Sequence, residues 1–286
     1  MKIKIGTRKS KLALAQTQMA ADALKAVFPE LETELVPVST AGDRVLDKPL
    51  YLIGGKGVFV SEIEQMLADG RIDIAVHSAK DLPSELADGL EISAVLKRGS
   101  YNDVLLTNKG TAIKKNFAVG TGSLRRRLNF GKICPDAVFK DIRGNVDTRL
   151  KKLANRELDG LILAAAGLER LGLADDSRFD YRYFDYTDFL PAPCQGIIAI
   201  ESRKSDFVTP IVKKINDTDT MLCLETEREV LRLLGADCTM PIGAYSYSDG
   251  NKIFLSLSSD GKRTVSGSAE IADRFELAKR LVKSLE

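Results

Sequence analysis

Strand-like runs alternate with helix-like runs along the first two thirds of the sequence, and this alternation limits the fold more than any other feature. Short apolar runs at residues 3–6, 35–39 and 72–76 are typical of strands. Residues 11–28 follow the helical period, with an apolar face predicted at Leu12, Ala15, Met19, Ala23 and Val27. Strands that alternate with helices predict an α/β fold that binds ligands at the carboxyl ends of its strands.

The same pattern starts again near residue 99 and predicts a second α/β region. Strands are expected at 103–107, 117–120, 138–142 and 160–164, and helices at 123–131, 145–154 and 165–172. The tail differs, because a helix at 217–234 precedes strands at 242–247, 252–258 and 263–269 and a final helix at 271–285. Asp-Gly in the turns between those strands is a strong hairpin signal.

We therefore predict three domains. Residues 1–97 with 195–214 form a discontinuous first α/β domain, because the strand expected at 197–201 returns to it. Residues 98–194 form a second α/β domain, and residues 215–286 form a small α+β domain. The length of 286 residues agrees, since it exceeds that of most single domains.

Arginines stand in the first turn of three predicted helices, each near a glycine turn. The segments are residues 6–10, 120–127 and 143–149. A helix N-terminus already carries partial positive charge and unpaired N–H groups, so arginine is unfavourable there unless an anion binds. Three such places predict one polyanionic ligand, held along its length by guanidinium groups. The simpler alternative is that each basic cluster is a solvated helix end.

The overall charge argues for a focused site. The chain has 42 basic and 40 acidic residues, which leaves a net charge of +2. A general nucleic-acid binder usually carries a basic excess, and single-stranded RNA is bound by stacked aromatic residues, which make up 6% of this chain with no tryptophan. The composition therefore favours a cleft for a small polyanion and predicts no nucleic-acid partner.

Cysteine and histidine usage narrows the chemistry. None of Cys134, Cys194, Cys223 and Cys238 forms a C-x-x-C pair, and His77 is the single histidine. A zinc ribbon, a thioredoxin-type motif and a histidine-rich metal site are therefore excluded, and we expect no metal. No apolar run approaches the roughly 20 residues that span a membrane. The start of the chain alternates like a strand, so we expect a cytoplasmic protein with free thiols and no membrane partner.

Two residues could carry chemistry by their position alone. Asp81 follows the strand at 72–76, so its carboxylate could act as general acid or base in the predicted cleft, unless it caps a helix or pairs with Lys80. Cys238 lies in a turn after the long helix, where a covalent role competes with that of a small buried hydrophobic residue. The glycine-rich segment at 54–57 lacks the Walker spacing and is therefore a weak candidate for a phosphate-binding loop. We expect His77 to be a hydrogen-bonded structural residue.

Taken in order, these segments resemble the hydroxymethylbilane synthase (porphobilinogen deaminase) family over nearly the whole chain. The matching motifs are Gly6-Thr7-Arg8-Lys9-Ser10, Gly54-Gly55-Lys56-Gly57-Val58-Phe59-Val60, His77-Ser78-Ala79-Lys80-Asp81-Leu82-Pro83, Gly120-Thr121-Gly122-Ser123-Leu124-Arg125-Arg126, Arg143-Gly144-Asn145-Val146-Asp147-Thr148-Arg149 and Cys238-Thr239-Met240-Pro241-Ile242-Gly243. One departure is Pro193-Cys194, which stands where the family pattern has Val-Gly. The resemblance implies two α/β domains like those of periplasmic binding proteins and a small α+β C-terminal domain.

The resemblance also implies an activity. The family joins four porphobilinogen molecules head to tail, releases ammonia each time and yields the linear tetrapyrrole hydroxymethylbilane. The chain starts from a dipyrromethane cofactor, attached through a thioether to the cysteine that matches Cys238. The catalytic aspartate of the family matches Asp81, which could stabilise the positive charge on a pyrrole nitrogen and shuttle protons. Every pyrrole brings two carboxylates, which suits a cleft rich in arginine.

The same match, residue by residue, implies the binding residues. Besides the covalent Cys238, the expected cofactor contacts are Lys80, Asp81, Thr121, Ser123, Arg125, Arg126 and Arg143. The expected substrate contacts are Arg8, Ser10, Lys56, Phe59, Arg149, Arg170 and Gln195. The resemblance further implies a monomer that could pass its product to uroporphyrinogen-III synthase. The competing function is a non-catalytic two-lobed anion-binding protein or sensor, which would not require a modified Cys238.

Overall fold

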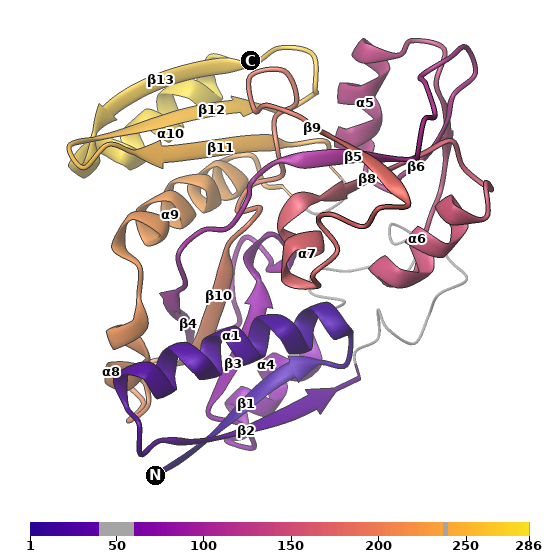
Figure 1. Ribbon diagram of the computed structural model, residues 1–286. Helices are drawn as coiled ribbons and strands as arrows, with labels where there is room; N and C mark the ends of the chain where they lie inside the picture. Colours follow the sequence, from indigo (N-terminus) through magenta and orange to yellow (C-terminus); the bar gives the residue numbers. More distant parts are fainter. Residues whose placement is uncertain (40–59, 237–239, 286) are drawn as a thin grey trace.

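The fold consists of three bodies, each built on its own sheet. The computed structural model describes residues 1–39, 60–236 and 240–285. In Figure 1 the first lobe lies at the bottom with the N-terminus, the second lobe lies at the upper right, and the small C-terminal sheet lies at the upper left. In these described parts, no helix is long and apolar enough to cross a membrane.

The first lobe holds a five-stranded sheet in the order β2-β1-β3-β10-β4. Its strands are β1 (Lys2–Arg8), β2 (Glu32–Val38), β3 (Ile74–Ser78), β4 (Leu90–Val95) and β10 (Ile198–Arg203). Strand β1 runs parallel to β2 and β3, whereas β10 runs antiparallel to both β3 and β4. The helices of this lobe are α1 (Lys11–Val27), α4 (Ser61–Ala68) and α8 (Thr209–Val212).

Helix α1 forms where the sequence predicts it, but the predicted apolar face is wrong. Met19 is 42% exposed and Val27 is 47% exposed. The buried residues are Gln16, Thr17, Ala20, Ala21 and Leu24. Small and polar residues face the sheet because they meet partners there: the Thr17 hydroxyl donates to Thr7 Oγ1 at 2.7 Å, and Gln16 Nε2 donates to Ser78 Oγ at 2.9 Å.

The second lobe holds another five-stranded sheet, in the order β7-β6-β8-β5-β9. Its strands are β5 (Asp103–Asn108), β6 (Ala118–Gly120), β7 (Val138–Lys140), β8 (Gly160–Ala164) and β9 (Phe179–Tyr183). Its helices are α5 (Leu124–Ile133), α6 (Val146–Ala154) and α7 (Ala165–Arg170). The sequence did not predict strands β4 and β9, and each is the edge strand of its sheet.

The third body is a three-stranded antiparallel sheet with two helices. Strands β11 (Gly243–Ser248), β12 (Lys252–Ser258) and β13 (Val265–Glu270) pair in sequence order. Helices α9 (Thr218–Leu233) and α10 (Arg274–Lys283) supply the rest of its core, which includes Val230, Leu255 and Leu277. The helix, hairpin series and closing helix expected from the sequence are confirmed.

The chain crosses between the two lobes twice, and this places the ligand site. Residues 96–102 lead from β4 to β5, and residues 184–197 lead from β9 back to β10.

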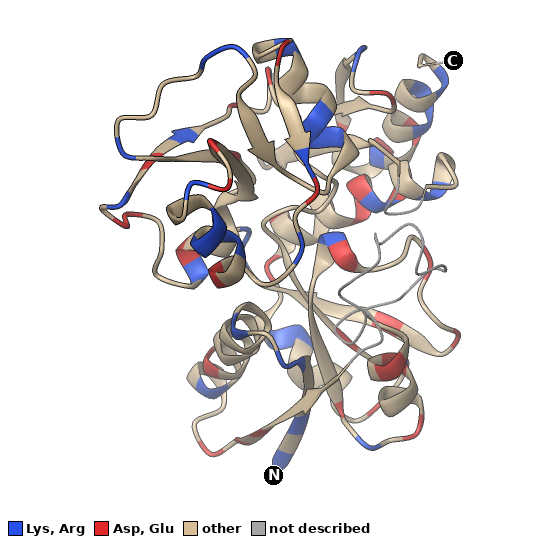
Figure 2. Ribbon diagram, turned by 90° about the vertical axis from the view of Figure 1, so that its right-hand side faces the viewer, with Lys and Arg blue, Asp and Glu red and all other residues tan. Residues whose placement is uncertain are grey.

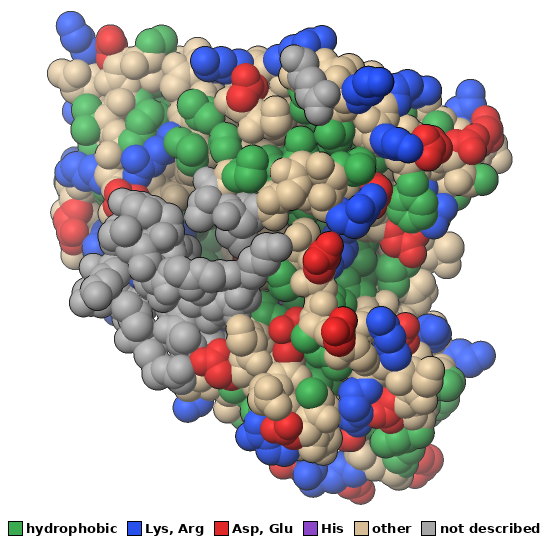
Figure 3. Space-filling model, turned by 180° about the vertical axis from the view of Figure 1, so that it is seen from behind, with side chains coloured by type: hydrophobic (Ala, Val, Ile, Leu, Met, Phe, Trp, Pro, Cys, Tyr) green, Lys and Arg blue, Asp and Glu red, His purple; other side chains and the backbone are tan. Residues whose placement is uncertain are grey.

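Basic and acidic residues are interspersed over all three bodies in Figure 2, as the near balance of charge predicts. The described part of the face seen in Figure 3 likewise mixes both signs of charge.

Candidate functional site

The candidate site begins where β3 ends in the first lobe. Residues Ile74 to Val76 are buried, and the chain then tightens into a 3-10 turn, Ala79–Asp81. Ala79 N donates to the Ile197 carbonyl oxygen at 3.0 Å, which ties the turn to the returning linker. Lys80 and the half-buried Asp81 are therefore presented at the carboxyl end of a central strand, as the sequence predicts.

The second lobe contributes Arg125 and Arg126 from the first turn of α5. Ser123 is the N-cap of this helix and accepts from Arg126 N at 3.4 Å, while Thr121 Oγ1 accepts from Ser123 N at 3.2 Å. Arg125 is 4% exposed and Arg126 is 8% exposed, so the alternative of a solvated helix end is wrong for this cluster. Both side chains instead turn inward onto Asp103 at the start of β5.

Asp103 is a buried carboxylate that sequence reasoning missed. Its Oδ2 accepts from Arg125 NH1 at 2.7 Å, and its Oδ1 accepts from Arg126 Nε at 2.9 Å and Arg126 NH2 at 2.7 Å. Gln195 Nε2 donates to the same Oδ1 at 3.1 Å. Burial alone raises the pKa of Asp103, but the two guanidiniums outweigh it and hold that pKa well below its usual range.

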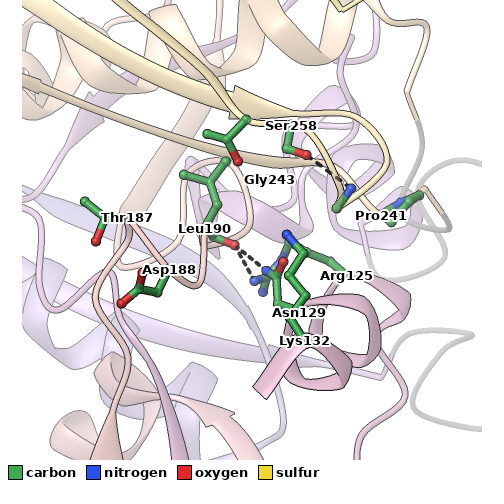
Figure 4. A pocket seen from close by; sticks show the side chains of 11 residues that line it. Arg125, Asn129, Lys132, Thr187, Asp188, Leu190, Pro241, Gly243 and Ser258 are labelled. Atoms are coloured by element: carbon green, nitrogen blue, oxygen red, sulfur yellow. Dashed lines mark hydrogen bonds between the residues drawn. The ribbon is translucent and has the colours of Figure 1, made fainter. Parts of the chain in front are cut away.

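Arg125 also reaches the boundary with the third body. Figure 4 shows Arg125 and Asn129 of α5 directed at the carbonyl oxygen of Leu190, which lies in the linker from β9 to β10. Arg125 NH1 donates to that oxygen at 2.7 Å and Asn129 Nδ2 donates to it at 3.3 Å. The pocket lined by these residues is bordered on its far side by Pro241, Gly243 and Ser258 of the third body. The arginine pair is thus held from two directions.

Lys80 faces this arginine pair across the boundary between the lobes. Its Nζ donates to Gln195 Oε1 at 3.4 Å. Burial and the positive charge of Arg126 together lower the pKa of Lys80 to about 8, against the opposing effects of Asp81 and Asp103. A lysine whose charge is this costly is well suited to gain an anionic partner.

Arg149 of α6 belongs to the same electrostatic cluster. Its Nε donates to the Gly144 carbonyl oxygen at 2.8 Å. Burial, together with the positive charges of Arg126 and Arg143, lowers the pKa of Arg149 to about 10, while Asp81 opposes this shift. These interactions place Asp81 of the first lobe within electrostatic range of α6 in the second.

The remaining predicted contacts lie around this centre. Arg170 NH2 donates to the Gly196 carbonyl oxygen at 2.5 Å, and burial lowers the pKa of Arg170 to about 10. Ser10 is the N-cap of α1 and accepts from Ala13 N at 3.2 Å, next to the half-buried Arg8. The three predicted residues Lys56, Phe59 and Cys238 lie outside the described residues.

Two expectations about histidine and cysteine are confirmed. His77 is buried, with Nε2 3.0 Å from Glu201 Oε2, as expected for a structural histidine. Cys223 is packed in the core of the third body. Burial raises the pKa of Cys223 to about 11 and that of Cys194 further still, so neither thiol is prepared to ionise. Within the described ranges, no cluster of three potential ligands could hold a metal ion.

The charge around Lys80 and the arginine pair shows whether the described residues fit a dipyrromethane group. The interacting cations are Lys80, Arg125, Arg126, Arg143 and Arg149. Among the described residues, the carboxylates that act on the strongly shifted Lys80 and Arg149 are Asp81 and Asp103. Two pyrroles with two carboxylates each would supply the missing negative charge, so the residues present fit this group.

Comparison with known proteins gives the family. Residues 3–209 match the family model "Porphobilinogen deaminase, dipyromethane cofactor binding domain", and residues 221–286 match "Porphobilinogen deaminase, C-terminal domain". A porphobilinogen deaminase of Streptococcus sanguinis is 41% identical, over 99% of this chain and 95% of its own. One of Rickettsia bellii is 45% identical, over 88% of this chain and 85% of its own.

Solved structures of other proteins show a weaker likeness. The substrate-binding domain of a putative molybdenum ABC transporter from Clostridium difficile is 12% identical, with a TM-score of 0.44, over 78% of this chain and 92% of its own. An arginine-specific periplasmic binding protein of Salmonella typhimurium is also 12% identical with a TM-score of 0.44, over 79% of this chain and 93% of its own. Two family models that together span both lobes and the third body carry the assignment: the chain belongs to the porphobilinogen deaminase family.

Proposed function

We propose that this transferase joins four porphobilinogen molecules head to tail, with loss of one ammonia each time, and releases hydroxymethylbilane. The observation that carries the proposal is the cluster of buried and half-buried cations from both lobes, of which Lys80 and Arg149 interact electrostatically with Asp81. A substrate with two carboxylates per ring fits such a cluster, and the family of the chain points to the same substrate.

We assign the attachment of the dipyrromethane cofactor to Cys238 through a thioether. The residues that hold its carboxylates are Lys80, Thr121, Ser123, Arg125, Arg126 and Arg143, together with Asp81 at its pyrrole nitrogens. When bound, the group supplies the free pyrrole carbon from which the chain grows. The cations fix its acetate and propionate groups, and the burial of Arg125 and Arg126 keeps water from these contacts.

Asp81 is the proposed catalytic residue. As porphobilinogen loses ammonia, it leaves an electron-poor azafulvene, and positive charge develops on a pyrrole nitrogen during the attack that follows. A carboxylate fixed at the end of β3 stabilises that charge and accepts or returns the proton. The residues proposed to bind the incoming substrate are Arg8, Ser10, Lys56, Phe59, Arg149, Arg170 and Gln195.

Replacement of Asp81 tests the catalytic assignment. Asp81→Asn should keep the fold and lower turnover by about 10²- to 10⁴-fold, because an amide can neither take up the proton nor balance the charge. Asp88→Asn, an exposed aspartate in the same connecting segment, is the matched control and should turn over normally. Turnover of Asp81→Asn within a few-fold of the parent would show that Asp81 is not catalytic.

Intact mass distinguishes this enzyme from an anion-binding protein or sensor. The purified parent should carry the mass of two pyrrole units, and peptide mapping should place them on Cys238. Cys194→Ser should retain the adduct and activity, whereas Cys238→Ser should lose both. A parent protein of unmodified mass would favour the binding protein, and an adduct on Cys194 would overturn the attachment assignment.

Three further assignments complete the proposal. The enzyme acts in the cytoplasm as a monomer and passes hydroxymethylbilane to uroporphyrinogen-III synthase. We assign residues 1–97 and 195–214 to the first domain, 98–194 to the second and 215–286 to the third. Sedimentation of the purified holoenzyme checks the monomer, and proteolysis checks the boundaries.

A further inference from the structure

Asp103 accepts more hydrogen bonds in the described structure than an ordinary surface ion pair. It is fully buried, and four hydrogen bonds from three side chains end on its two oxygens. It stands at the first position of β5, directly after the linker 96–102. Gln195, one of its partners, lies in the other linker, so Asp103 is located where both crossings between the lobes meet.

The partners of Asp103 have little freedom left. All three nitrogens of the Arg126 guanidinium donate within the protein: Nε and NH2 to Asp103, and NH1 to the Ile162 carbonyl oxygen at 3.1 Å. Arg125 NH1 is shared between Asp103 and Leu190. The two guanidiniums carry like charge at neighbouring positions of one helix, so a carboxylate between them is needed to keep them together.

Gln195 extends this arrangement to the first lobe. Its Nε2 donates to Asp103 Oδ1 at 3.1 Å and to the Tyr101 carbonyl oxygen at 2.7 Å, which fixes the orientation of the amide. Its Oε1 is then available to accept from Lys80 Nζ. Lys80 adjoins Asp81, so one continuous set of contacts runs from the arginine pair to the residue proposed as catalytic.

We propose that Asp103 is a positioning residue for the reaction: it holds Arg125 and Arg126 in one fixed arrangement and, through Gln195, sets the place of Lys80. This inference rests on the proposed function. Asp103 itself does not touch the substrate, and its carboxylate cannot be replaced by an amide, whose N–H₂ group would face the guanidiniums. The cluster is thereby assembled before any carboxylate of the ligand arrives, which lowers the ordering cost of binding.

Three variants test the proposal on the purified holoenzyme. Asp103→Asn should lack the two-pyrrole adduct or raise the KM for porphobilinogen at least tenfold, with a smaller change in kcat. Asp103→Glu, which restores the charge, should recover part of that loss. Asp176→Asn is the matched control: Asp176 also binds an arginine through both oxygens, but its partner Arg178 is exposed and outside the site. That variant should keep the parent KM.

A folded Asp103→Asn protein with adduct and parent KM would overturn the proposal. Should Asp103→Asn fail to fold, Gln195→Met decides, because it leaves the pairs of Asp103 with the arginines intact and removes the contact with Lys80. The alkaline limb of its kcat/KM profile should move to lower pH; an unchanged profile with unchanged KM would overturn the link to Lys80. A parent protein without adduct or turnover would instead remove the proposed function.

Discussion

Asp103 in the second lobe and Glu227 in helix α9 are both fully buried carboxylates with arginine partners, but their surroundings differ. Asp103 binds two guanidiniums and lies near Lys80. Glu227 binds one guanidinium, that of Arg98, at 2.7 and 3.2 Å, and otherwise accepts from neutral donors: Ser246 N, Ser246 Oγ and Cys194 N. Counted over the described residues, the first cluster has more cations than carboxylates, whereas in the second one guanidinium faces one carboxylate.

We infer that the difference separates the proposed ligand site from a cluster with a purely structural role. The balanced Glu227 cluster connects Arg98 of one linker, Cys194 of the other and β11 of the third body, so its contacts are all internal. Burial alone lowers the pKa of Arg98, and Glu227 reverses this and raises it. Among the described residues around Asp103 the interacting cations outnumber the carboxylates, which suits an anionic ligand. Gln195 touches both clusters, since its carbonyl oxygen also accepts from Arg98 Nε at 2.9 Å.

The largest effect should follow from removing the one cation of the balanced cluster. Arg98→Met leaves Glu227 buried without its ionic partner and should lower the free energy of unfolding by about 3–5 kcal/mol. Urea unfolding measures the loss. The protein that remains folded at low temperature should bind porphobilinogen with nearly the parent KM. A loss of stability below about 1 kcal/mol would mean that the Glu227 cluster does not stabilise the contact between the linkers and the third body.

Removal of a cation from the Asp103 cluster should weaken substrate binding and leave stability nearly unchanged. Arg149→Leu should weaken substrate binding by roughly tenfold to hundredfold, the usual range for a lost charge-assisted hydrogen bond. Its unfolding midpoint should change little, because less repulsion with Arg126 and Arg143 offsets the lost contacts. Native mass spectrometry should show intermediates trapped at particular chain lengths. A normal distribution of intermediates with normal turnover would remove Arg149 from the site.

The pH dependence of kcat/KM should report the charge of Lys80. The pKa of Lys80 is lowered to about 8, so its charge is present below that pH and is lost as pH rises through it. Bound carboxylates favour the charged form, so kcat/KM should fall by a few-fold as pH rises from about 7 to about 9. In Lys80→Arg the cation persists, and this decline should move to higher pH. The same alkaline limb in both proteins would exclude Lys80 as its origin.

The smallest effect is expected at an arginine in neither cluster. Arg156 follows the last turn of α6, is exposed and has φ 60, in the left-handed region. Arg156→Gly should therefore stabilise the protein by about 0.5–1 kcal/mol without any change in turnover. Arg156→Ala, which keeps the strained backbone, should not gain stability. Equal unfolding midpoints for the two variants would contradict the backbone explanation.

The structural positions of Lys80, Asp81 and the first turn of α5 could be predicted because their signals are local. A buried run that ends in His77 to Asp81 marks a strand end, and glycine followed by serine and arginine marks the start of α5. The ordered motifs also gave the family, with both α/β lobes and the third body. Met19 and Val27 of α1 were placed wrongly because packing against the sheet selected smaller residues of the helix.

Asp103 and Glu227 could not be found in this way because their partners are distant in sequence. Asp103 meets Arg125, Arg126 and Gln195 at separations of 22, 23 and 92 residues. Read alone, Asn102-Asp103 is a common turn pair, and Glu227 is one of several acidic residues on an amphipathic helix. The turn from Cys194 to Gly196 did carry a hint: the resemblance implies glycine at the position of Cys194, and the φ of 61 found there is one that glycine adopts more easily.

The position of β10 has a consequence for the order in which the polypeptide matures during synthesis. Strand β10 lies between β3 and β4, so the first sheet lacks an interior strand until residues 198–203 have left the ribosome. The second sheet, β5 to β9, needs only residues 103–183 and is complete earlier. Although the first lobe contains the N-terminus, the edges of β3 and β4 that pair with β10 stay unpaired while the second lobe folds. Unpaired strand edges are exposed to wrong pairing, so we expect these two strands to need protection during synthesis.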